Sequence, residues 1–316
     1  MAAMTAIPES PGRTPDGRVD PRLAAMMQRA TYAAVATALV LIVAKFIAYV
    51  STDSVSVLST LLDSLLDAAA SMVNLIAVRT ALQPADREHR FGHGKAEPLA
   101  GLGQSAFVAG SAIFLLFEVG NRLVNPQPIE RSAVGIAVMA GSIVVTIFLV
   151  LYQRRVIRIT KSMAIAADSL HYFSDLMVNS SVIVALVLAT QLGWRFVDPI
   201  FGAGIAAYIL YTAWQIARGS YDMLMDRELP DAERARIRAL ALANPAVRAV
   251  HDLRTRGAGP NSFIQLHLEM DGAMRLIDAH EVSDDVEQTI MNAFPGAEVI
   301  IHQDPEGVDE PRVSFA

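Results

Sequence analysis

The sequence predicts an α-helical membrane protein with six transmembrane helices, followed by a C-terminal cytoplasmic α+β domain of ferredoxin-like type. Six apolar runs are each long enough to cross a bilayer, which takes roughly 20 residues. Residues 227–316 have no such run. Their apolar residues instead recur with the spacing of helices in some segments and of strands in others. The mean hydropathy of +0.37 and the 53% content of hydrophobic residues exceed what a soluble domain needs.

The chain divides into three parts by composition. Residues 1–30 are rich in Pro, Gly, Arg and Asp and have no apolar core, so we expect a disordered cytoplasmic tail and lead-in rather than a signal peptide. Residues 31–226 hold the six apolar runs. Residues 227–316 contain 9 Lys+Arg and 16 Asp+Glu, an acidic balance that argues against nucleic acid as a partner and suits cations. The absence of cysteine excludes disulfides and thiolate metal sites.

An even number of spans places both termini on the same side of the membrane. Twelve Lys and Arg residues lie in the tail and in the loops 79–98 and 152–161, whereas the opposite loops hold three. Because positive loops stay in the cytoplasm, we expect both termini there. The six expected spans are 31–50, 55–80, 99–124, 132–153, 162–190 and 196–222.

The second and fifth spans carry ionisable side chains in pairs. Asp63 and Asp67 are four residues apart, as are His171 and Asp175, so each pair shares one helical face. Asp67 and Asp175 both fall near mid-span, which places the pairs at one depth. Ionisable groups at that depth are costly and indicate function. Three carboxylates and an imidazole suit Zn²⁺, Fe²⁺, Mn²⁺ or Cd²⁺, so the pattern favours a metal-ion transporter over buried, protonated carboxylates. Asp168 lies on the same face and either lines an access path or caps the helix start.

The loop between the second and third spans offers a second set of ligands. Asp86, His89 and His93 follow a plausible metal-binding spacing, and Glu88 is a competing ligand. Gly92 and Gly94 allow the backbone to turn tightly around a bound ion. The alternative is a solvated charged loop whose histidines are incidental.

The sequence pattern of the C-terminal segment predicts helix 231–243, strand 249–256, strand 261–270, helix 278–293 and strand 297–302. This αββαβ order predicts a small open α+β sandwich. Three histidines fall on strands and the fourth opens a helix, which predicts a zinc site, made binuclear if a carboxylate bridges two ions. The alternative for any one histidine is a surface or core imidazole. The residues considered are His251, His267, His280, His302, Gln303 and Asp304.

These motifs together resemble the cation diffusion facilitator family, and in particular its bacterial ferrous-iron and zinc efflux branch, from about residue 30 to 305. The stretches that carry the resemblance are Asp63–Asp67, Gln83–Lys95, His171–Asp175, His251–Arg256, Gln265–Met270 and Ile301–Pro305.

The resemblance implies a homodimeric exporter of the bacterial inner membrane that exchanges divalent metal for protons. It also implies six spans and a cytoplasmic metallochaperone-like domain. Its transport site would be Asp63, Asp67, His171 and Asp175, and its loop site Asp86, His89 and His93. Its cytoplasmic binuclear site would be His251, His267, His302 and Asp304, with His280 and Gln303 as further members. Lys95 and Asp226 stand where relatives form a charge interlock at the dimer.

Two other functions compete with transport. A membrane-embedded metallohydrolase would need a general base and an open metal position, and the sequence offers no His-Glu-x-x-His motif. A metal sensor would use the cytoplasmic domain without moving ions. We therefore expect no enzyme activity. We expect Zn²⁺ to be both the transported ion and a structural or regulatory ion, and Fe²⁺ or Cd²⁺ to be further substrates.

Overall fold

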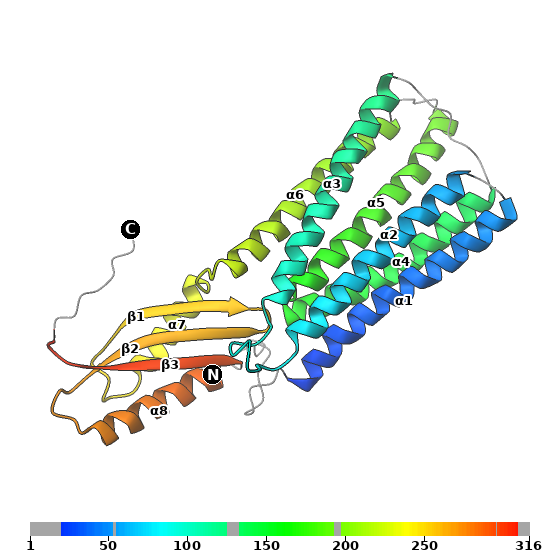
Figure 1. Ribbon diagram of the computed structural model, residues 1–316. Helices are drawn as coiled ribbons and strands as arrows, with labels where there is room; N and C mark the ends of the chain where they lie inside the picture. The colour runs from blue at the N-terminus through cyan, green and yellow to red at the C-terminus, as the bar shows by residue number, and fades with distance from the viewer. Residues whose placement is uncertain (1–19, 53–54, 125–132, 193–196, 295, 309–316) are drawn as a thin grey trace, which may run out of the picture. The chain divides into compact units, whose positions relative to one another are not determined.

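The structure is a computed structural model that describes residues 20–52, 55–124, 133–192, 197–294 and 296–308. Eight helices and three strands lie in this part of the chain (Figure 1). They form two compact units, one of residues 24–81 and 95–221 and the other of residues 1–23, 82–94 and 222–316. Most of the expected disordered tail, residues 1–19, lies outside the described residues.

The first unit is built from six long helices that run side by side (Figure 1). Each matches one expected span, but α1 begins ten residues before residue 31 and α4 extends seven residues beyond residue 153. The early start of α1 follows from Pro21 at its first position and from Asp20 Oδ1, which accepts the Arg22 N–H at 2.7 Å. The helices are α1 (Pro21–Thr52), α2 (Val55–Ala81), α3 (Ala96–Val124), α4 (Ala133–Thr160), α5 (Met163–Leu192) and α6 (Val197–Leu224).

The outer faces of these helices suit a lipid environment. Phe114, Phe117 and Phe148 are exposed by 70% or more, which would be costly in water. By length and hydropathy, α1, α2, α3 and α4 each hold a segment able to cross a membrane. Helices α5 and α6 are as long, and part of each lies outside the side chains that the structure describes.

Helix α5 packs against α2, α3 and α4. Ala164 and Ala167 on its first turns are fully buried. Small side chains let helix backbones approach closely, so the helix that carries His171 is held on several sides.

The second unit contains the predicted α+β domain in the predicted order: α7 (Asp231–Leu242), β1 (Ala249–Ala258), β2 (Asn261–Met270), α8 (Leu276–Ala293) and β3 (Ala297–Pro305). The sheet order is β1-β2-β3, with β1 antiparallel and β3 parallel to β2. Strand β3 runs three residues beyond the expected end, so His302 lies within it. Helix α8 begins two residues early, so His280 lies inside the helix rather than opening it.

The domain core lies between the helices and one face of the sheet. Leu266 and Leu268 of β2 are buried with Ile237 of α7 and Ile290 of α8. Because side chains alternate along a strand, His267 between those two leucines lies on the opposite face. The sheet therefore offers the face away from its helices for polar ligands.

Candidate metal centres

The predicted intramembrane ligands of α2 and α5 lie together. His171 Nε2 is 2.9 Å from Asp67 Oδ1 and 3.8 Å from Asp175 Oδ2. Donor atoms of these three residues all lie within 4.8 Å of one another. His171 is 5% exposed, so this contact joins the two helices within the interior of the unit.

Asp63 faces the same space as the other three residues. A cavity of about 670 Å³ is lined by Asp63, Asp67, His171 and Asp175. The structure thus brings all four predicted transport residues to one cavity. Three carboxylates and one imidazole around it provide the oxygen and nitrogen donors that a divalent transition metal takes.

Two further charged residues line this cavity, and the sequence analysis did not select them. Lys45 comes from α1 and Glu118 from α3. The signal for Lys45 was a single lysine within the apolar run 31–50. Intramembrane charges are functional candidates by default, and the same rule that selected the aspartates applies to this lysine.

Asp168 is 1% exposed and accepts hydrogen bonds from three other helices. Its donors are Ser71 Oγ of α2 at 3.2 Å, Gln104 Nε2 of α3 at 3.2 Å and Gln153 Nε2 of α4 at 2.6 Å. Asp168 is not the cap of α5, because it is the sixth residue of that helix. It ties α2, α3 and α4 to α5 close to His171, and it is not among the residues that line the cavity.

The start of α5 is instead held by Ser162 and Glu97. Ser162 Oγ accepts the Ile165 N–H at 3.2 Å and donates to Glu97 Oε1, at the start of α3. Glu97 is 2% exposed. A serine immediately before a helix satisfies one of the otherwise unpaired first N–H groups.

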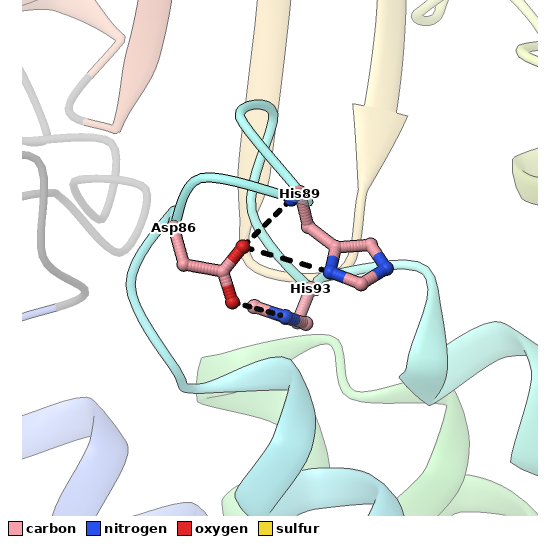
Figure 2. A group of neighbouring side chains, drawn as sticks. All are labelled: Asp86, His89 and His93. Carbon is pink, nitrogen blue, oxygen red and sulfur yellow. Dashed lines mark hydrogen bonds and ion pairs between the residues drawn. The ribbon is translucent and has the colours of Figure 1, made fainter.

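The loop residues Asp86, His89 and His93 form a second group with donor atoms within 4.8 Å (Figure 2). Asp86 Oδ1 lies 3.6 Å from His89 Nδ1, and Asp86 Oδ2 lies 3.3 Å from His93 Nε2. Asp86 Oδ1 also accepts the His89 N–H at 2.7 Å and the Glu88 N–H at 2.9 Å. These backbone donors, that of His89 foremost, hold the pKa of the Asp86 carboxyl below its ordinary range.

The cytoplasmic histidines lie side by side on three strands. His251 of β1 pairs in register with His267 of β2, which pairs in register with His302 of β3. Their ring centroids are separated by 5.1 Å and 4.7 Å. The sequence predicted these histidines on strands; the sheet register is what aligns them.

Asp304 contacts all three imidazoles. Its Oδ2 lies 2.8 Å from His267 Nδ1 and 3.1 Å from His251 Nε2, and its Oδ1 lies 3.1 Å from His302 Nε2. A carboxylate with both oxygens directed at separate imidazoles has the arrangement that a bridging ligand between two ions requires. Asp304 is 6% exposed and the His302 side chain is 62% exposed, so the cluster is buried at Asp304 and open to solvent at His302.

Two more carboxylates join this cluster without having been selected from the sequence. Glu269 Oε1 lies 3.1 Å from His251 Nδ1, and Asp252 Oδ2 lies 3.8 Å from His267 Nε2. Glu269 was detectable, because it follows His267 by two residues and so shares its face. Asp252 has φ +44° at the irregularity in the β1–β2 pairing. Its hydrogen bonds from Arg254 lower the pKa of its carboxyl.

His280 and Gln303 lie away from this cluster within the protomer. His280 on α8 is 62% exposed and lies 3.5 Å from Asp284. Gln303 pairs with Leu268 on the helix side of the sheet, and its amide donates to Ser283 Oγ at 3.0 Å. Neighbouring residues of a strand point to opposite faces, so His302 and Gln303 cannot face the same way.

One buried imidazole nitrogen of the loop has no hydrogen-bond partner among the described residues. It is the buried Nδ1 atom of His93, whereas His251 Nδ1 lies 3.1 Å from Glu269 Oε1. Buried polar atoms are normally satisfied, and an imidazole nitrogen without a partner is a ready metal donor. The donor set of the loop therefore fits a bound metal ion.

Comparison with known proteins gives matches over both units. The family model described as "Cation efflux transmembrane domain" matches residues 31–225, and that described as "Cation efflux protein, cytoplasmic domain" matches residues 229–306. The cation-efflux pump FieF of Klebsiella pneumoniae is 49% identical over 283 residues, 90% of this chain and 94% of the relative. FieF of Salmonella arizonae is 49% identical over 89% of this chain and 93% of its own length. The solved zinc form of the putative zinc transporter CzrB is 40% identical over 27% of this chain and 99% of that chain, with a TM-score of 0.26.

Proposed function

The chain belongs to the cation efflux family, the cation diffusion facilitators that its motifs resemble, and from this premise we propose that it exports Zn²⁺ in exchange for protons as a homodimer. Cation efflux is the function of the family. The metal, the antiport mechanism and the assembly are the parts that we propose.

The observation that carries the proposal is the contact of His171 with Asp67 inside a cavity that Asp63 and Asp175 also line. A site between helices at the middle of the bilayer is where alternating-access transporters bind their substrates. Zn²⁺ suits the three carboxylates and the imidazole, and Fe²⁺ and Cd²⁺ accept the same donors.

We further propose that all six long helices span the bacterial inner membrane, with both termini in the cytoplasm. The distribution of Lys and Arg among the loops supports this orientation. In this orientation the loop site and the sheet site bind Zn²⁺ as resident ions on the cytoplasmic side. Bound cations would offset the repulsion between two acidic domains and so favour the dimer.

Membership of the cation efflux family argues against a metallohydrolase and against a non-transporting sensor. Purified protein in proteoliposomes, loaded with a metal-sensitive dye, distinguishes transport from both when Zn²⁺, Fe²⁺, Cd²⁺ and Mn²⁺ are supplied in turn outside. Time-dependent accumulation of metal that requires the protein supports transport. Zn²⁺ binding without accumulation would contradict it, and the order of rates among the metals identifies the preferred cargo.

A further inference from the structure

Lys45 places a positive charge in the cavity of the predicted transport site. Among the described residues that line this cavity, it is the single lysine or arginine. Its ammonium donates to Ser64 Oγ at 2.6 Å and to the Thr60 carbonyl at 3.0 Å, both on α2. Lysines near helix ends usually extend toward the membrane surface, whereas this side chain is turned onto the neighbouring helix.

The position of Ser64 brings the ammonium close to the metal ligands. Ser64 stands between Asp63 and Asp67 on α2, and it is 1% exposed. Lys45 lines the same cavity as Asp63, Asp67 and Asp175, so its positive charge and their carboxylates attract one another across that space. In a low-dielectric interior such interactions are far stronger than in water.

When no metal is bound, the carboxylates of the cavity must be offset by protons or by another positive charge. Asp63, Asp67, Asp175 and Glu118 all line it, and isolated ionised carboxylates are costly to bury. Lys45 provides that charge on a flexible stem. A metal ion that reaches the same carboxylates is attracted by them and repelled by the ammonium.

We propose that Lys45 is a tethered counter-cation that weakens metal binding at the transport site and thereby speeds release of the ion. The inference rests on the proposed transport function and goes beyond it. Each cation lowers the affinity of the site for the other, because coupling between two bound charges is reciprocal. A site of several carboxylates without Lys45 would bind the ion tightly and release it slowly.

A simpler role for Lys45 is to tie α1 to α2 through hydrogen bonds. Lys45→Gln distinguishes the two roles, because the amide still donates hydrogen bonds but carries no charge. Lys45→Met removes both, and Lys45→Arg keeps the charge. Arg155→Met is the matched control, because it removes a cation from an exposed position of α4 that does not line the cavity.

The test measures Zn²⁺ flux in proteoliposomes and separates KM from kcat. We expect Lys45→Gln and Lys45→Met to lower KM by about tenfold, as loss of a nearby unit charge in a partly shielded site predicts, and to lower kcat as well. Lys45→Arg and Arg155→Met should behave like the parent. If Lys45→Met does not insert into the membrane, the KM of Lys45→Gln alone distinguishes the role of the charge from that of the hydrogen bonds.

An unchanged or raised KM in Lys45→Gln would overturn the inference, as would equal defects in Lys45→Gln and Lys45→Arg. Absence of Zn²⁺ flux in the parent protein would instead contradict the proposed function. The two failures are therefore distinguishable in one series of measurements.

Discussion

The guanidinium of Arg256 on β1 lies 5.1 Å from the ring centroid of Phe91 in the loop between α2 and α3. It also lies 4.7 Å from the ring of Phe263 on β2, and the two rings meet edge to face at 5.7 Å. Asp226 pairs with the same guanidinium at 3.3 Å. Nearby, a side chain on Gly94 would meet the carbonyl oxygen of Ala258 at 2.1 Å. The loop that carries Asp86, His89 and His93 is therefore packed on the cytoplasmic sheet.

Replacing Arg256 by Gln should loosen this loop without unfolding the sheet. The variant loses the cation–π contacts of Arg256 with both Phe91 and Phe263. Each such contact is worth about 0.5–1 kcal/mol at an exposed site. Faster hydrogen exchange in residues 82–94 is the expected readout. Arg236→Gln is the control, because Arg236 lies 5.2 Å over Phe294 elsewhere in the domain. Equal exchange in the loop of both variants would contradict the packing role of Arg256.

Asp86 should have separable structural and metal-binding roles. Because its pKa is lowered by the His89 and Glu88 amides, its contribution to loop order is complete above the ordinary value of 3.8 and is lost as pH falls through the lowered pKa. At neutral pH, Asp86→Asn should keep the loop ordered, since an amide oxygen still accepts both N–H groups, but should weaken Zn²⁺ binding there. Asp86→Ala should lose both properties. Hydrogen exchange and Zn²⁺ titration measure them, and equal loosening in the two variants would refute the assignment.

Zn²⁺ should draw the cytoplasmic domains of the two protomers together through the sheet site. A ligand that binds one arrangement more tightly shifts the population toward it. An inter-protomer distance probe should respond to Zn²⁺ in the parent and not in His267→Ala/His302→Ala. His280→Ala should respond like the parent, because His280 is exposed and lies outside the cluster within the protomer. A full response in the double variant would remove the sheet site from this role.

The sequence predicts local features here better than long-range ones. Alternation around His267 located its strand, because period-two patterns directly reflect side-chain direction. The i,i+4 spacing likewise placed Asp67 and Asp63 on one face of α2. Residue spacing within one helix could not show that Lys45 of α1 contacts Ser64 of α2, because that contact depends on how the two helices pack.

The same limit explains why the packing of the loop on the sheet was not predicted. Phe91 and Phe263 are far apart in sequence, and nothing local to either indicates their contact. Gln303 shows a different limit. The family resemblance grouped it with His302 in the cytoplasmic site, whereas strand geometry directs these two neighbours to opposite faces of the sheet.

Transport should depend on both helices that form the intramembrane contact. Asp67→Ala removes the oxygen 2.9 Å from His171, and Asp175→Ala removes a second carboxylate of the same group. Each should abolish Zn²⁺ flux in proteoliposomes while the protein remains inserted and dimeric by size-exclusion chromatography. Asp222→Ala, the same change near the end of α6, should retain flux. Parent-like flux in either of the first two variants would remove that residue from the transport site.

Finally, an acidic receiving compartment should accelerate Zn²⁺ transport, and His171 should mediate most of this effect. Metal binding needs a neutral imidazole and ionised carboxylates, so it releases protons and is weakened by acid. The exterior of the inner membrane is more acidic than the neutral cytoplasm. A site that faces outward would therefore gain protons and lose its ion, and a site that faces inward would do the reverse.

The measurement is Zn²⁺ uptake into inside-out vesicles with and without an acidic lumen. Parent protein should take up Zn²⁺ faster with the gradient, and His171→Ala should lose most of that dependence. The carboxylates around His171 can share the proton, so a residual pH effect in the variant is expected from the site as a whole. If Zn²⁺ uptake by the parent does not change with the pH gradient, the protein transports Zn²⁺ passively down its concentration gradient. The exchange mechanism would then be wrong.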